Sequence, residues 1–166
     1  MKPKANLEQV STKTLLPFLI EMLDLGKQVR LTVTGNSMLP LWLNGRDSVI
    51  LQKVEAPKKY DVVLYRRHNG DVILHRIVRH TSEGYMILGD NQTQIDGPIL
   101  PSDIIAAVTG FYRDKTYYSV NTWWHVLYCR IWVAVRPLRR ILLPLARFVG
   151  RLIKHIENGE KHEMDS

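Results

Sequence analysis

Cysteine is almost absent from the chain, which has one, Cys129, among 166 residues. A single cysteine excludes an internal disulfide and offers no cysteine pair at the spacing of a zinc site. Long apolar runs are also missing near the N-terminus, where the apolar patch at residues 15–20 is short and is followed by Glu21 and Asp24. We therefore expect neither a cleavable signal peptide nor a membrane anchor in that region.

Acidic residues are missing from one late segment. Residues 122–154 contain seven Lys or Arg residues and no acid, whereas residues 155–166 contain one Lys and four acids. The net charge of +7 therefore has its main source in the first of these segments. The length allows one hydrophobic core, with a remainder too small for a second full domain. We expect residues 1–28 to form an N-terminal helix and lead-in, 29–121 the main domain, 122–154 a basic amphipathic membrane-associating segment, and 155–166 an acidic disordered tail.

The N-terminal part and the middle of the chain differ in their hydrophobic pattern. Residues 7–25 place apolar side chains at helical spacing and are followed by Gly26 as a C-cap, which predicts a short amphipathic helix. Beyond it come short runs rich in Val, Ile and Tyr, separated by Gly, Pro, Asn or Asp. These predicted strands are residues 29–34, 47–54, 61–66, 71–79, 85–88 and 104–112. The pattern predicts a mainly β domain, either a sheet or a partly closed barrel.

The stretch Gly35–Pro40 follows the first predicted strand. Gly35 frees the backbone to turn, and Pro40 suits the first turn of a helix. This places Ser37 at a strand-to-turn junction, close to unpaired backbone amides that can stabilise an oxyanion. The alternative is that Ser37 only caps the turn that follows it.

Three further polar residues suggest acid–base chemistry. His75 lies within a predicted strand that is otherwise apolar apart from Arg76, and a polar loop at residues 89–97 contains Asp90 and Asp96. An imidazole can accept a hydroxyl proton at neutral pH because its usual pKa is near 6.5. A serine, a histidine and an aspartate can act as nucleophile, base and orienting acid. The alternatives are a structural histidine and aspartates that only form turns.

Four short motifs occur in an order that is typical of one protease family. They are Ser37–Pro40, Tyr60–Val63, His75–Val78, and Gly89–Asn91 with Asp96 soon after it. Together they resemble the signal peptidase I family. The resemblance is strongest to its archaeal and endoplasmic-reticulum branch, in which a histidine takes the place of the lysine found in bacterial members.

The resemblance covers residues 29–112 and implies a role for each polar residue. It implies Ser37 as the nucleophile, His75 as the general base, Asp96 as the acid that orients the imidazole, and Asp90 as a supporting carboxylate. It also implies a mostly β catalytic domain, no metal or organic cofactor, and small side chains such as alanine beside the cleaved bond.

The sequence departs from the family at the nucleophile. Family members usually have a serine two residues before it, whose hydroxyl helps to bind the oxyanion, and here that position is Gly35. The Gly-x-Ser-Met sequence that ends at Met38 is instead similar to LexA-type self-cleaving repressors. Oxyanion binding is therefore expected to depend on the Ser37 amide and on the Gly35–Met38 turn. Asn36 or Thr34 is expected to aid this binding.

A second departure is that no N-terminal membrane span is predicted, and the segment Trp123–Lys154 suggests a substitute. Its first half is rich in Trp and Tyr, which favour the membrane interface. After Pro137, basic residues gather on one helical face and apolar residues on the other. This predicts an interfacial helix on anionic lipid, since prolines and arginines interrupt every longer apolar run. The alternatives are a helix packed on the β domain or on another subunit, and nucleic-acid binding, for which no module is recognisable.

Two other sites are weaker candidates. His68, Asp71 and His80 flank the predicted base, but they match no metal-ligand motif. His125 and Cys129 are an i, i+4 pair that could form a thiol site, although a buried structural cysteine fits their apolar surroundings better.

These observations and the resemblance predict a serine endopeptidase that cleaves signal or leader peptides through an acyl-enzyme. Signal-peptide cleavage ranks first, and the alternative within this class is a cytoplasmic protease that processes the leader of a small precursor peptide. A different class also stays open, namely a self-cleaving regulator or a non-catalytic peptide-binding domain. The expected partners are a precursor peptide and membrane lipid, with no nucleic acid. The expected location is the membrane, by peripheral or C-terminal attachment, on a side that the sequence does not define.

Overall fold

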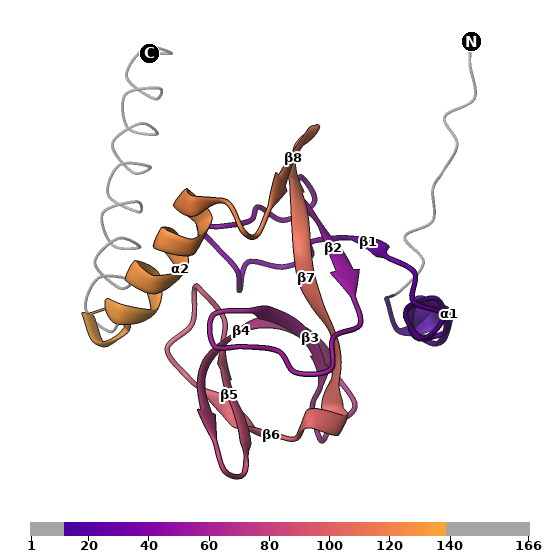
Figure 1. Cartoon of the computed structure of the whole chain (residues 1–166), viewed down its shortest axis with the longest axis horizontal. Coiled ribbons are helices and arrows are strands. Elements are labelled where there is room, and N and C mark those ends of the chain that lie inside the picture. Colours follow the sequence, from indigo (N-terminus) through magenta and orange to yellow (C-terminus); the bar gives the residue numbers. More distant parts are fainter. Residues whose placement is uncertain (1–11, 139–166) are drawn as a thin grey trace, which may run out of the picture.

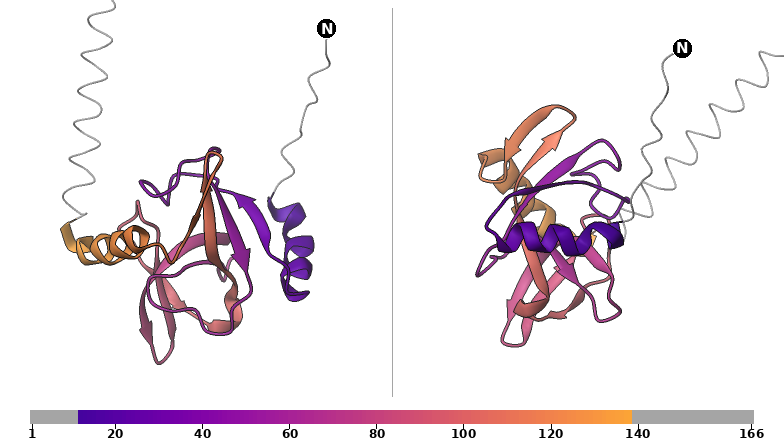
Figure 2. Two further views of the ribbon diagram at one scale, coloured as in Figure 1. Left: turned by 45° about the horizontal axis from the view of Figure 1, so that its top comes forward. Right: turned by 90° about the vertical axis from the view of Figure 1, so that its right-hand side faces the viewer.

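The computed structural model describes residues 12–138 and is mainly β, as predicted (Figure 1). Its strands form one antiparallel eight-stranded sheet in the order β1-β2-β7-β3-β4-β5-β6, with β8 paired to β7. The elements are α1 (Thr12–Asp24), β1 (Val29–Thr32), β2 (Ser48–Gln52), β3 (Val62–Arg66), β4 (Val72–Thr81), β5 (Gly84–Leu88), β6 (Asp96–Ile99), the 3-10 turn η1 (Pro101–Asp103), β7 (Ile104–Arg113), β8 (Thr116–Ser119) and α2 (Trp123–Ala134). The two helices lie on opposite sides of the strands (Figures 1 and 2).

All six predicted strands are present, but two more were missed. Strand β6 falls partly in the region 89–97 that was predicted as a loop, because Gly97 and Pro98 are turn formers in most contexts. Strand β8 is short and has no buried residue, so its sequence has no apolar alternation to detect. The expectation of a loop at 89–97 is therefore wrong from Asp96 onward.

Helix α1 confirms the predicted amphipathic helix within the described residues, and the part expected at residues 7–11 lies outside them. Leu19 and Leu23 point into the core. The helix ends at Gly26, which has φ +74°, and its amide donates to the Leu23 carbonyl at 3.0 Å. Glycine adopts this left-handed conformation without a Cβ penalty, so the predicted C-cap is confirmed.

The register of the β3–β4 hairpin decides which side chains can meet. Val63 pairs with His75, and side chains on a strand alternate between the two faces of the sheet. Tyr65 and His75 therefore share one face, where the smaller of two apolar clusters lies. Arg76 points to the opposite face, which carries the larger cluster around Trp42.

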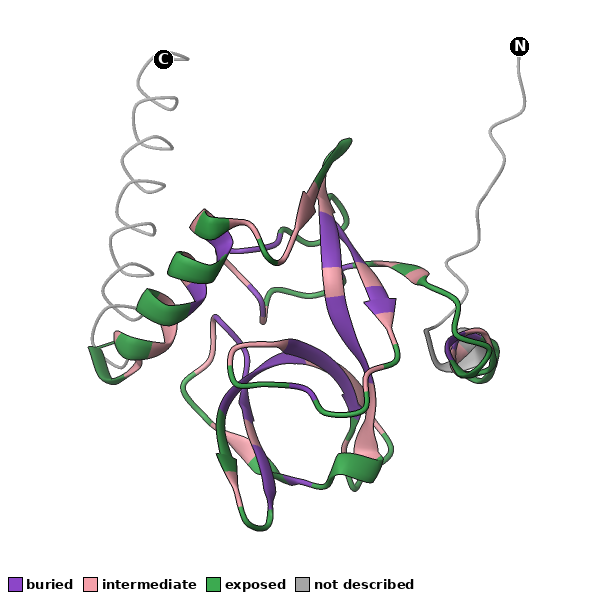
Figure 3. Cartoon of the chain, viewed as in Figure 1, coloured by how far each residue is buried: buried purple, intermediate pink, exposed green. Residues whose placement is uncertain are grey.

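Helix α2 packs against the β domain along one side (Figure 3). His125 and Cys129 are buried, and the ring nitrogen Nδ1 of His125 lies 2.8 Å from the Val120 carbonyl oxygen. Trp123 and Leu127 face outward, with Trp123 77% exposed. Residues 123–134 thus form a helix packed on the β domain, which was the alternative to an interfacial helix on lipid. The outer face of this helix is nevertheless apolar. Within residues 12–138, no helix has the length and apolar character needed to cross a membrane.

Candidate active site

The turn after β1 presents Ser37 much as its sequence suggests. Gly35 has φ +78°, which glycine adopts readily, and its amide donates to Asn44 Oδ1 at 3.2 Å. No helix continues from Pro40, but successive turns follow, and one of them is a single helical turn in which the Trp42 amide donates to the Met38 carbonyl at 3.2 Å.

The backbone amides of this turn differ in their availability as oxyanion donors. The Gly35 amide is already occupied by Asn44, as described above. The Asn36 side chain is exposed, and the Asn36 carbonyl accepts from Asn91 Nδ2 at 3.1 Å. Among residues 12–138, the amides of Ser37 and Met38 make no hydrogen bond. These two amides are therefore the best placed to bind an oxyanion.

Ser37 and His75 converge on Gly89. The Asn91 amide donates to the Ser37 carbonyl at 2.8 Å and so holds the Ser37 turn against the turn that follows β5. A Cβ placed on Gly89 would lie 2.9 Å from His75 Nε2 and 2.9 Å from the Ser37 carbonyl oxygen. These two atoms are therefore no farther apart than twice that distance. His75 Nε2 and the Ser37 carbonyl oxygen thus border the same space, which a side chain on residue 89 would fill.

His75 is buried, and its second ring nitrogen faces two oxygen atoms. Nδ1 lies 3.3 Å from the Tyr65 hydroxyl and 3.6 Å from Asp96 Oδ2. The pKa of His75 is lowered to about 4, chiefly by burial and also by the Arg67 charge, against the opposing effect of Asp96. The ring is therefore neutral at pH 7 and able to accept a proton at Nε2.

Asp96 is held by two residues that the sequence analysis missed. The Tyr65 hydroxyl donates to Asp96 Oδ2 at 2.5 Å, and Arg67 donates to the same oxygen from Nε, at 3.1 Å, and from Nη2. Burial acts to raise the pKa of Asp96, but these hydrogen bonds bring it below its usual value. Asp96 is thus an anion, and the Tyr65 hydroxyl lies between its carboxylate and Nδ1 of His75 as the shorter link.

The hairpin turn gives no correct sequence signal for Tyr65. Asn69-Gly70 is a strong two-residue hairpin signal, but a loop of those two residues would pair Arg66 with Ile73 and Tyr65 with Leu74, on the face opposite His75. The structure has a longer turn instead, in which the Arg67 amide donates to the Asp71 carbonyl at 2.8 Å and Gly70 has φ +84°, so that Arg66 pairs with Val72 and Tyr65 shares the face of His75. No pattern points to Arg67, which follows the end of β3.

The Asp90 carboxylate faces away from the imidazole. It binds Arg76 through both oxygens, with Nε to Oδ1 at 2.9 Å and Nη2 to Oδ2 at 2.7 Å, and both side chains are buried. Because Arg76 and His75 are neighbours on β4, they point to opposite faces. Asp90 raises the pKa of His75 only through its charge, so its direct role is to fix Arg76 and the turn at Gly89.

A small pocket lies beside Ser37. It has a volume of about 180 Å³. The apolar side chains that line it come from the end of β1, the turn that contains Ser37, and the β3–β4 hairpin. They are Leu31, Val33, Met38, Leu64, Val72, Ile73 and Leu74. Within residues 12–138, strand β1 is also an edge of the sheet and pairs only with β2. An extended peptide can add to such an edge and place a small apolar side chain in the pocket.

The weaker candidates gain nothing from the structure. Within the described residues, no group of three or more His, Cys, Asp or Glu side chains could hold a metal ion. His80 stacks on the Tyr85 ring, with centroids 4.7 Å apart. Cys129 is buried as expected, and burial raises the pKa of its thiol, which disfavours the nucleophilic thiolate.

Comparisons with known proteins add no further observation about the site. No protein-family model matches the chain, and no curated protein matches it either.

Proposed function

We propose that the protein is a serine endopeptidase in which Ser37 is the nucleophile and His75 the general base. The observation that supports this most is the convergence of the Ser37 turn and His75 Nε2 on Gly89. The buried imidazole is neutral, and its far nitrogen is directed toward Tyr65 and Asp96. A nucleophile, a base and a group that orients the base are the parts that acyl transfer requires.

In the proposed reaction, His75 Nε2 takes the proton of Ser37 as Oγ attacks the scissile carbonyl. The carbonyl oxygen gains negative charge and accepts from the Ser37 and Met38 amides. The imidazolium then gives its proton to the leaving amine as the peptide bond breaks. Asp96 stabilises the transient positive charge through Tyr65. Water attacks the acyl-enzyme by the same route and restores the Ser37 hydroxyl.

The proposed substrate is a signal or leader peptide bound as an extended strand. The apolar pocket beside Ser37 suits a small side chain next to the cut, and the β1 edge offers backbone hydrogen bonds. Protease protection of a tagged chain in intact cells separates the two substrates. A domain protected from external protease supports a cytoplasmic leader and contradicts an exported signal peptide.

We also propose that the protein associates with the membrane surface through α2. The helix exposes Trp123, Leu127 and Ile131 on its outer side, next to Arg130. It contains no acidic residue, so its charge suits an anionic bilayer. The second basic stretch, at residues 139–154, lies outside the described residues and is expected to add to this binding.

Cleavage of a candidate leader peptide by Ser37→Ala and His75→Ala variants tests the peptidase. Both variants should lose turnover by at least a thousandfold while keeping the wild-type melting temperature. Ser102→Ala and His68→Ala change the same residue types at exposed positions and should stay active. Substantial cleavage by either site variant contradicts the mechanism.

The same variants separate the alternative class. A Ser37→Ala chain used as a trap should retain the uncut precursor from cell extract, and mass spectrometry identifies it. If the wild-type chain retains the same peptide without cutting it, the domain is a peptide-binding module. If the chain cuts only itself, at a rate independent of its concentration, it is a self-cleaving regulator.

A further inference from the structure

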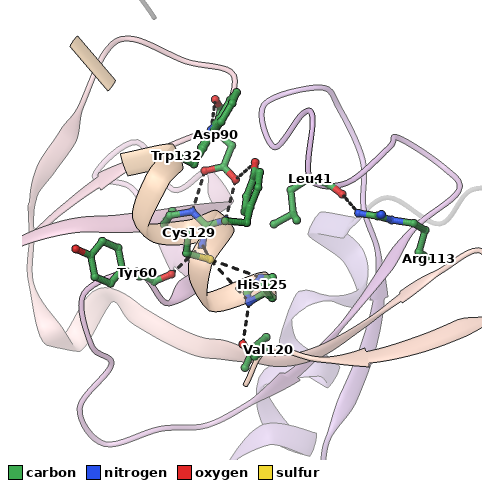
Figure 4. A network of polar contacts seen from close by, with 10 residues as sticks. Leu41, Tyr60, Asp90, Arg113, Val120, His125, Cys129 and Trp132 are labelled. Carbon is green, nitrogen blue, oxygen red and sulfur yellow. Dashed lines mark hydrogen bonds and ion pairs between the residues drawn. The ribbon is translucent and has the colours of Figure 1, made fainter. Parts of the chain in front are cut away.

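Helix α2 forms hydrogen bonds to Asp90, which lies in the turn after β5. The indole nitrogen Nε1 of Trp132 donates to the Asp90 carbonyl at 3.0 Å, and the Tyr128 hydroxyl donates to Asp90 Oδ2 at 3.3 Å (Figure 4). A guanidinium nitrogen of Arg76, the ion-pair partner of Asp90, lies 2.8 Å from Cys129 Sγ. One side of α2 thus contacts both members of a buried ion pair.

The same turn also lies against the Ser37 turn and the His75 ring. The Asn91 amide binds the Ser37 carbonyl at 2.8 Å, and Asn91 Nδ2 binds the Asn36 carbonyl at 3.1 Å. Gly89 leaves the space that His75 Nε2 occupies. The turn at residues 89–91 therefore contacts α2 through Asp90 and the Ser37 turn through Asn91, and its Gly89 borders His75 Nε2.

We propose that α2 is a positioning element of the peptidase, and that Tyr128 and Trp132 set the approach of Ser37 to His75 by fixing the Gly89–Asn91 turn. This inference rests on the proposed function. Tyr128 and Trp132 both donate to Asp90, so the proposed effect on the serine and the imidazole passes through the turn. Catalysis depends steeply on such placement, since a shift of about 1 Å can cost roughly a hundredfold in rate.

The competing explanation is that α2 only covers the core. The two hydrogen bonds to Asp90 would then contribute to stability alone. The two explanations differ in what changes when the bonds are removed but the rings are kept. A covering role changes the melting temperature, whereas a positioning role changes the rate of the chemical step.

Trp132→Phe and Tyr128→Phe in the full chain remove the hydrogen-bond donors and keep aromatic rings in place. These rings stack on each other, with centroids 5.6 Å apart, so packing is largely preserved. We expect kcat to fall by about tenfold to a hundredfold at an unchanged KM. Tyr117→Phe on β8 is the matched control, because it removes an exposed tyrosine hydroxyl outside the turn at residues 89–91, and it should keep the wild-type kcat.

Hydrogen exchange of the Asn91 amide, followed by NMR, gives a readout that does not depend on cleavage. It should be faster in Trp132→Phe than in the wild-type chain, because the turn is less constrained. A wild-type kcat in both α2 variants, or an unchanged Asn91 exchange rate, overturns the inference and leaves the peptidase standing. An inactive wild-type chain overturns the peptidase and with it the positioning role, and faster Asn91 exchange then shows only that α2 restrains the turn.

Discussion

The His75 imidazole is closer to the Tyr65 hydroxyl than to the carboxylate that was expected to orient it. Nδ1 lies 3.3 Å from the hydroxyl oxygen, while Asp96 Oδ2 is 3.6 Å away. Since the hydroxyl itself donates to Asp96, Nδ1–H is the donor that completes the chain from imidazole to carboxylate. This tautomer leaves the Nε2 lone pair free on the side of Ser37.

Tyr65→Phe should therefore lower kcat/KM by about tenfold or more, since it removes the acceptor that fixes the imidazole tautomer. The ring stays in place, so the melting temperature should change little. Tyr85→Phe, on the same face of the sheet, is the control and should keep wild-type kinetics. Wild-type kinetics for Tyr65→Phe as well would mean that Asp96 orients the imidazole without the hydroxyl.

The acid limit of the pH–rate profile should lie well below the range typical of histidine. The dependence of kcat/KM on pH reports the base of the free enzyme, and burial holds the pKa of His75 at about 4. Activity should thus persist below pH 6 and fall only as the pH approaches 4. In Arg67→Gln the loss of a nearby positive charge raises this pKa, so the acid limb should move to higher pH.

The matched control for this titration is Arg66→Gln, which removes an exposed arginine one position away. Its profile should superimpose on the wild-type profile. A wild-type acid limb near pH 6.5, or equal shifts in Arg66→Gln and Arg67→Gln, would contradict the assignment of the buried His75 as the titrating base.

Gly89→Ala should impair activity more than stability. The added Cβ would lie 2.9 Å from both His75 Nε2 and the Ser37 carbonyl oxygen, so one of the two must move. We expect kcat to fall by tenfold to a hundredfold or more, measured on the same leader peptide. Gly26→Ala, at the end of α1, strains a left-handed glycine far from the site and should lower the melting temperature while leaving kcat unchanged.

Asp90→Asn should be among the most destabilising conservative changes in the chain. It leaves the Arg76 guanidinium buried without its charge partner, which costs about 3–5 kcal/mol in comparable buried pairs. Asp24→Asn is the control, because its ion pair with Lys53 is exposed and is expected to contribute no more than about 1 kcal/mol. Urea unfolding measures both, and equal effects would show that the Asp90 pair is not a structural anchor.

The sequence was enough to predict the strands with alternating apolar residues and the turn at Gly35, and it singled out Ser37 and His75, whose catalytic roles stay predictions. These features depend on patterns within short segments of the chain, and contacts between distant segments do not change them. Tyr65 and Arg67 were missed because their contact with Asp96 joins β3 to β6, a strand whose Gly97 and Pro98 imitate a turn. Long-range strand order sets such contacts, and a single sequence does not encode that order in any local pattern.

The orientation of Asp90 was missed for a related reason. Its role as a supporting carboxylate came from its place in a motif, whereas its direction follows from the alternation of His75 and Arg76 on β4. The contacts from Tyr128 and Trp132 were equally hidden, because they require α2 to fold back on the β domain. The amphipathic pattern of that helix fitted lipid and protein surfaces alike.

The outer side of α2 supplies the last prediction. Leu127→Glu with Ile131→Glu should weaken binding to vesicles that contain anionic lipid by at least tenfold, since each change replaces an exposed apolar side chain that would enter the interface with a charge. Leu100→Glu, an exposed leucine in the loop between β6 and η1, is the control and should bind like the wild-type chain. Vesicle co-sedimentation measures all three chains, and wild-type binding should weaken with salt because Arg130 and its basic neighbours contribute charge. Equal binding by the double variant and the wild-type chain would show that the outer side of α2 does not enter the lipid interface, since that interface cannot accept two carboxylates without loss of affinity.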